Sequence, residues 1–198
     1  MPSARYSDLQ LDALRELANI GSGNAGTALS ALLGRPVDIS VPNASALELA
    51  DAVDAAGAAE EVVWAVVVAV GGELEATALL VVSEHDAEAI GALLGVDPES
   101  EDGRSAFEEI GNILVASYVG ALGAMTGFVL DLRPPASARD MLGAVVATVI
   151  AAHSDGRDIA IMLDSELRVE RDAIALSFML LPTPEGVDEL LQRIGLGG

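Results

Sequence analysis

Two stretches of the chain decide its fold: DALRELANIGSGNAGTALSALLGRPVDISVP at residues 12–42 and SAFEEIGNILVASYVGALGAMTGFVLDLRPP at residues 105–135. A shift of 93 residues aligns them without a gap. Alanine and glycine matches arise easily by chance in this composition, but matches of rarer residue types do not. Four such pairs fall in register: Glu16/Glu109, Asn19/Asn112, Asp38/Asp131 and Pro42/Pro135. The sequence therefore predicts an internal duplication, on which the fold prediction depends.

Each copy begins with the pattern of a long amphipathic helix. Ser7 is a candidate N-cap of the first helix, and Gly34 followed by Pro36 ends its helical pattern. Apolar or small residues recur with a helical period on one side of both helices. They are Leu11, Leu14, Ala18, Ala25, Leu29 and Leu32 in the first copy, and Phe107, Gly111, Leu114, Tyr118, Leu122 and Met125 in the second. We expect both faces to be buried in equivalent ways.

The rest of each copy predicts strands and a closing helix. The predicted strands are residues 37–41 and 128–132, which end at Pro42 and Pro135, then 62–70 and 74–82 around Gly71-Gly72, and 157–163 and 168–181 around Asp164-Ser165. The predicted closing helices are residues 84–94 and 183–194, with a linker at 96–102. Residues 43–57 fit either a helix or a loop.

This order, given twice, predicts an α+β fold made of duplicated helix–strand–hairpin–helix units with pseudo-two-fold symmetry. Its two long helices would pack on an antiparallel sheet. One half alone would leave a sheet edge uncovered, so we expect residues 1–198 to form a single domain. Repeat 1 would span about 7–95 and repeat 2 about 102–195.

The composition argues against several classes of function. A net charge of -21 offers no basic patch for nucleic acid. The absence of cysteine excludes thiolate chemistry, and two separated histidines, His85 and His153, make a histidine metal site improbable. The first residues show no signal-peptide pattern, which favours a cytoplasmic protein. Residues 110–130 carry no charge over a membrane-spanning length, but their polar residues and the repeat argue against insertion.

Polar residues line the other side of each long helix. Asp12, Glu16 and Asn19 are spaced to share one stripe, and Ser105, Glu109 and Asn112 repeat it. Asparagine is unfavourable inside a helix because its side chain competes for backbone hydrogen bonds. One explanation is structural: the two asparagines bond across the pseudo-two-fold interface, and the glutamates are simply solvated. The paired occurrence favours a functional explanation.

The pattern Asp/Ser-x3-Glu-x2-Asn-x22-Pro resembles the signature of the CheC family, the CheC/CheX/FliY-type chemotaxis phosphatases. Two sets of residues carry it: Asp12, Glu16, Asn19 and Pro42, and Ser105, Glu109, Asn112 and Pro135. The resemblance implies hydrolysis of the aspartyl phosphate of a CheY-like receiver. It implies that Asn19 and Asn112 orient the attacking water and that Glu16 and Glu109 engage the receiver's lysine. Asp12 and Ser105 would support docking, and Pro42 and Pro135 would shape the backbone.

The same resemblance implies the cofactors and partners. The chain would bind no cofactor or metal of its own, and the phosphorylated receiver would bring Mg²⁺. The alternative is a non-catalytic signalling adaptor that binds CheD or a motility-switch component. The sequence Gly21-Ser-Gly-Asn-Ala-Gly26 also matches a dinucleotide-binding pattern, but it lies within a predicted helix and is absent from the second copy. We expect those glycines to serve close helix packing.

Overall fold

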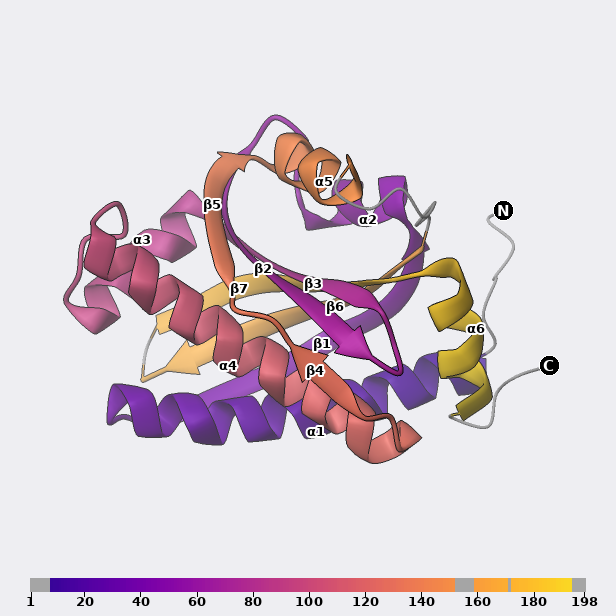
Figure 1. The fold of residues 1–198 in the computed structure, drawn as a ribbon. Coiled ribbons are helices and arrows are strands. Elements are labelled where there is room, and N and C mark those ends of the chain that lie inside the picture. The colour runs from indigo at the N-terminus through magenta and orange to yellow at the C-terminus, as the bar shows by residue number, and fades with distance from the viewer. Residues whose placement is uncertain (1–7, 152–158, 171, 194–198) are drawn as a thin grey trace.

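The computed structural model describes residues 8–151, 159–170 and 172–193. The elements follow the predicted helix–strand–hairpin–helix order in both halves, but the structure adds helices at residues 49–56 and 142–151 and a strand at 136–141 (Figure 1). They are α1 (Asp8–Leu33), β1 (Val37–Glu48), α2 (Leu49–Ala56), β2 (Val62–Gly72), β3 (Ala76–Ser83), α3 (Glu84–Leu94), α4 (Glu101–Thr126), β4 (Leu130–Leu132), β5 (Ala136–Met141), α5 (Leu142–Ala151), β6 (Ile159–Val169), β7 (Asp172–Pro182) and α6 (Pro184–Arg193).

The strands form one antiparallel sheet in the order β1-β6-β7-β3-β2-β4, and β5 extends the edge by pairing with β2 beside β4. Replacing each strand by its counterpart in the other half reproduces this order read from the opposite edge. The pseudo-two-fold relation therefore passes between β7 and β3, where Leu80 pairs with Phe178. Strands from both halves share the sheet, and the predicted α+β class is confirmed.

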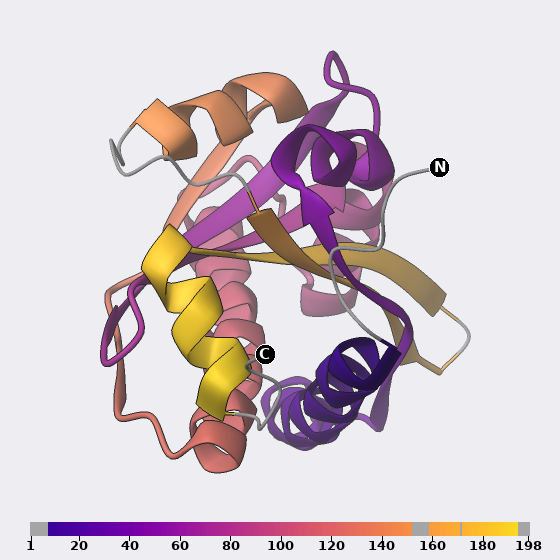
Figure 2. The same cartoon turned by 90° about the vertical axis from the view of Figure 1, so that its right-hand side faces the viewer.

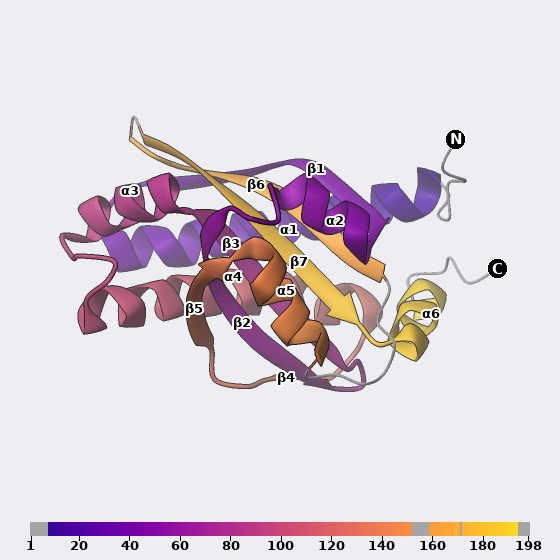
Figure 3. The same cartoon turned by 90° about the horizontal axis from the view of Figure 1, so that it is seen from above.

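The sheet lies between two layers of helices (Figure 2). On one face α1 and α4 lie side by side, and their apolar residues form the larger core with alternate residues of the strands. On the opposite face α2 and α5 cover a smaller core (Figure 3). Leu14, Ala18 and Leu29 of α1 are buried as predicted, whereas Leu32 is 46% exposed, contrary to the prediction. The side chain of Leu11 and the predicted cap Ser7 lie outside the described residues.

The second hairpin was predicted with the wrong turn. β6 runs without interruption through Asp164 and Ser165, and its pairing with β7 continues to Val169 and Asp172. The chain reverses there, and Glu170 has a positive φ of 56°. Asp164 and Ser165 resemble turn residues, but Asp164 accepts a hydrogen bond from Asn43 Nδ2 at 3.1 Å, and the Ser165 hydroxyl lies 3.0 Å from the Tyr118 hydroxyl. These bonds come from residues distant in the sequence.

Three other predicted boundaries also differ. β1 does not end at Pro42 but continues to Glu48, with a register shift between Ser40 and Asn43. The residues predicted as helix or loop thus divide into strand and the helix α2. Gly71-Gly72 belongs to β2, and the turn follows it. α4 begins at Glu101, inside the predicted linker, because the Ser100 hydroxyl accepts a bond from Gly103 N at 3.0 Å and caps the helix.

The long uncharged segment, residues 110–130, lies in α4 and the residues that lead into β4. Among the residues that the structure describes, no helix is long and apolar enough to cross a bilayer.

Candidate active site

The motif side chains lie on the outer faces of α1 and α4, away from the sheet. Asp12, Glu16 and Asn19 of α1 are all exposed. In α4 Ser105 and Glu109 are exposed and Asn112 is half-buried. Both stripes are therefore accessible to a protein that docks on the helix layer.

Packing of the opposite helix faces fixes this orientation. Leu14, Leu17 and Ala18 of α1 are buried against the sheet. In α4 the corresponding side is held by Phe107, whose ring stacks on Trp64 with centroids 5.2 Å apart. Because residues four and seven apart share a side of a helix, burial of these apolar faces turns the Glu and Asn pairs outwards.

The motif asparagines keep their hydrogen-bonding capacity available. Neither Asn19 nor Asn112 forms a side-chain hydrogen bond with any residue in the described part of the chain. Glu16 and Glu109 likewise form no ion pair with any of the described residues. The purely structural explanation, in which the two asparagines bond across the helix interface, is therefore not supported. An amide with a free oxygen and a free NH₂ group can hold a water molecule in one orientation.

The surroundings of the two motifs differ. In α1 the Arg15 guanidinium donates to the Asp12 carboxylate at 2.6 Å, and both side chains are more than half exposed. In α4 the corresponding positions are Glu108 and Ser105. The Glu108 carboxylate accepts bonds from both Ser137 N and Ser137 Oγ, at 3.1 and 2.7 Å. Glu108 was not predicted from the sequence; it stands where the first copy has Arg15, directly before the repeated glutamate.

The two motif prolines occupy equivalent breaks in the sheet. Pro42 lies in β1 at the register shift, and Pro135 separates β4 from β5. At both places a proline, which lacks the N–H donor, coincides with an interruption of the hydrogen-bonded ladder. These positions are consistent with a role in shaping the backbone.

The glycines of α1 serve close packing in part. A Cβ at Gly21 would lie 2.3 Å from Tyr118 Cδ1, so α1 and α4 pack closely there. A Cβ at Gly26 would lie 3.2 Å from Val37 O of β1, whereas Gly23 faces open space. All three lie in the middle of a helix, which is not the strand–turn–helix context of a dinucleotide site.

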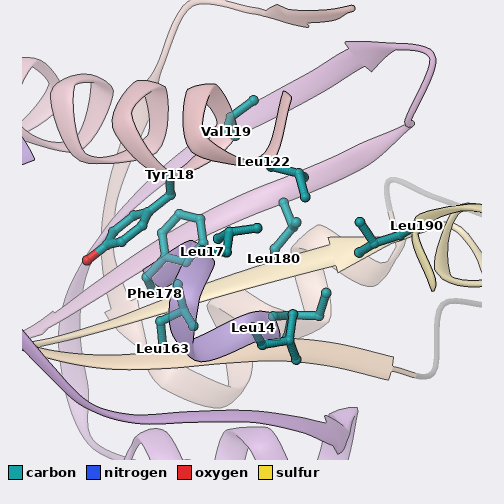
Figure 4. Close-up of a pocket in the computed structure, with 10 residues that line it drawn as sticks. Leu14, Leu17, Tyr118, Val119, Leu122, Leu163, Phe178, Leu180 and Leu190 are labelled. Carbon is teal, nitrogen blue, oxygen red and sulfur yellow. The ribbon is translucent and has the colours of Figure 1, made fainter. Parts of the chain in front are cut away.

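A small apolar cavity lies in the interior between the long helices and the sheet. Figure 4 shows Leu14 and Leu17 of α1 facing Tyr118 and Leu122 of α4 across it, and its volume is about 20 Å³. It is lined by side chains of the core, not by the motif residues. Within the described residues, no group of three or more His, Asp or Glu side chains is arranged to hold a metal ion. The motif faces, with their exposed carboxylates and their amides, are the candidate site.

Comparison with known proteins finds a matching family and two similar proteins. The CheC-like family matches residues 9–45 and 103–138, which cover the two copies of the motif. The CheY-P phosphatase CheC of Bacillus subtilis (strain 168) is 30% identical over 94% of both chains. The flagellar motor switch phosphatase FliY of the same organism is 31% identical over 65% of this chain and 35% of that protein.

Solved structures share the fold at lower sequence identity. Thermotoga maritima FliY superposes with a TM-score of 0.77 at 19% identity, covering 98% of this chain and 100% of that one. The FliM middle domain from H. pylori gives a TM-score of 0.70 at 14% identity, covering 95% and 99%.

Proposed function

Because this chain belongs to the CheC-like family, we propose that it is a phosphatase that hydrolyses the aspartyl phosphate of a CheY-like response regulator in chemotaxis signalling. One structural observation carries the assignment of the site. Each long helix presents an exposed glutamate and, one turn later, an asparagine whose amide has no partner in the described chain. Both copies of the motif are therefore available to a docked receiver.

The chemistry requires positioning more than covalent participation. A phosphorylated receiver docks on the outer face of α1 or α4, and its own Mg²⁺ stabilises the charge on the phosphoryl group. The carboxamide of Asn19 or Asn112 holds a water molecule in line with the bond to be broken. The water oxygen bonds to phosphorus as the phosphorus–oxygen bond to the receiver's aspartate breaks. The aspartate leaves as a carboxylate, and inorganic phosphate keeps both hydrogens of the water.

The glutamates anchor the docked receiver. Glu16 or Glu109 accepts a charge-assisted hydrogen bond from the receiver's active-site lysine, which fixes the helix beside the phosphoryl group. Asp12 and Ser105, one turn earlier, support docking. The proposed chemistry requires no metal or cofactor bound by the chain itself, and we expect the protein to act in the cytoplasm beside its receiver.

Replacement of both asparagines tests the proposal. The Asn19→Ala, Asn112→Ala double variant should lose stimulated phosphate release from a phosphorylated CheY-type receiver, because neither helix could orient the water. Each single variant should keep part of the activity. The control is the melting curve, which should change little because Asn19 is exposed and Asn112 is half-buried.

The same assay distinguishes the alternative function. A non-catalytic adaptor that binds CheD or a motility-switch component would bind its partner without accelerating phosphate release. Full activity in the double variant would exclude these asparagines as the catalytic groups. Absence of any stimulated release by the unmodified protein would favour the adaptor.

A further inference from the structure

Glu108 connects the second motif helix to the edge of the sheet. Its half-buried carboxylate accepts two hydrogen bonds on the same oxygen, Oε1, from Ser137 N at 3.1 Å and Ser137 Oγ at 2.7 Å. Ser137 belongs to β5 and follows Pro135 by two residues. Glu108 directly precedes Glu109, so this contact is made within a fraction of a helical turn of the motif.

The first copy lacks this contact at the equivalent position, and α1 is joined to β1 at its other end, where Val37 N donates to Ser30 Oγ at 2.9 Å. Arg15 stands at the position of Glu108, and its guanidinium bonds to Asp12 of its own helix. Ala44, which corresponds to Ser137 in the repeat, is a buried residue of β1 without a hydroxyl group. This side-chain contact between motif helix and edge strand is therefore specific to the second copy.

A second close contact lies on the other side of the motif glutamate. A Cβ at Gly111 would approach Val66 Cγ1 to 2.5 Å, so the backbone of α4 lies directly on β2 at that point. Val66 is also the residue of β2 that pairs with Ser137 in the sheet. Glu108 and Gly111 thus contact neighbouring points of the same two strands. Together they fix the distance of α4 from the sheet, and its rotation about its own axis, at Glu109 and Asn112.

We infer that Glu108 is a positioning residue of the second motif: by accepting both Ser137 donors it holds α4 in the rotation that presents Glu109 and Asn112 to a docked receiver. This inference rests on the proposed phosphatase function. Both donors belong to Ser137 and end on one oxygen, Oε1, so the contact ties this turn of α4 to a single residue of β5. Glu108 itself contacts neither receiver nor water.

The test uses an Asn19→Ala background, in which only the second motif can act. Glu108→Ala should lower kcat for phosphate release about tenfold with a smaller change in KM, because slight misplacement of a positioned group mainly costs rate. Glu108→Gln should retain most of the activity, because its amide oxygen can accept both Ser137 donors. That rescue would not occur if Glu108 acted through its negative charge.

A second substitution and a control complete the experiment. Ser137→Ala removes one donor and should reduce kcat less than Glu108→Ala does, and combining the two should add nothing to Glu108→Ala. Glu101→Ala removes an exposed carboxylate from the same helix and should leave kcat unchanged. Unchanged kcat in Glu108→Ala, or an equal loss in Glu108→Gln, would overturn the inference. The proposed function fails separately, if the double asparagine variant stays active.

Discussion

Tyr118 lies where the two motif helices and the sheet meet. Its ring lies against Gly21 of α1 and 4.8 Å from the ring of Phe178 in β7. Its hydroxyl lies 3.0 Å from Ser165 Oγ of β6. Burial raises the pKa of Tyr118 above its ordinary value, and the bond to Ser165 lowers it by a smaller amount. The neutral hydroxyl is therefore part of the folded core.

This raised pKa predicts loss of stability in alkali. Below the ordinary tyrosine pKa of about 10 the stabilisation is fully present, and it is lost as the pH rises through the higher pKa of the folded state. The sequence has no lysine and no cysteine, and Tyr6 is the other tyrosine, so few other side chains titrate there. Tyr118→Phe should reduce the alkaline decline in the free energy of unfolding, measured by urea titration. At pH 7 it should cost about 1–2 kcal/mol, because Ser165 loses its partner. An unchanged alkaline decline would contradict the assignment.

At the scale of single residues, the catalytic candidates could be predicted from the sequence and their support could not. Asn19 and Asn112 stood out because asparagine is disfavoured in mid-helix and occurred twice in register. Glu108 directly precedes a motif glutamate, and from the sequence alone it cannot be told from a solvent-exposed acid on the helix surface. Only the folded position of Ser137 gives it a partner, and that residue is distant in the sequence.

The helix α4 tolerates a methyl group at some glycines and not at others. A Cβ at Gly111 would lie 2.5 Å from Val66 Cγ1, and relief requires α4 to move away from β2. Gly111→Ala should therefore cost about 1–3 kcal/mol in the free energy of unfolding. It should also lower phosphate release by the second motif, because Asn112 is the next residue.

Gly120 provides a matched control in the same helix. It is exposed, and a Cβ there would meet no atom within 4 Å. Gly120→Ala should therefore stabilise the protein by up to about 1 kcal/mol, since alanine is the better helix former. If urea unfolding showed equal effects of the two substitutions, the close contact with β2 would not explain the cost of a methyl group at position 111.

The elements differ in how far the sequence determines them. The helices α3 and α6 and the cores of β2 and β3 were predicted closely, because period, caps and flanking turns agree there. The failures lie where distant residues override local signals. Ser165 has the residue type of a turn, but its hydroxyl is hydrogen-bonded to Tyr118 within β6. Pro42 has the residue type of a strand end, but β1 pairs with β6 on both sides of it. Such partners are not visible in a window of neighbouring residues.

At the scale of the whole molecule, the duplication produces one sheet whose halves meet at β3 and β7. Trp64 in the first half stacks on Phe107 in the second, so the only tryptophan reports on packing between the halves. A sheet and core shared in this way favour one cooperative transition. Trp64 fluorescence and far-UV circular dichroism should therefore give coincident urea unfolding curves, and separate midpoints would mean that the halves unfold independently.

The same molecule carries 31 acidic and 10 basic residues, which repel one another on balance in the compact state. Added salt shortens the range of that repulsion from about 30 Å at 0.01 M to about 10 Å at 0.1 M. The urea midpoint should therefore rise as sodium chloride is added, in both the fluorescence and the circular dichroism signal. Potassium chloride at the same ionic strength should give the same rise, because screening depends on ionic strength and not on the identity of the cation. A midpoint that rises with only one of the two salts would point instead to specific ion binding, and a midpoint that falls would mean that the surface ion pairs outweigh the net negative charge.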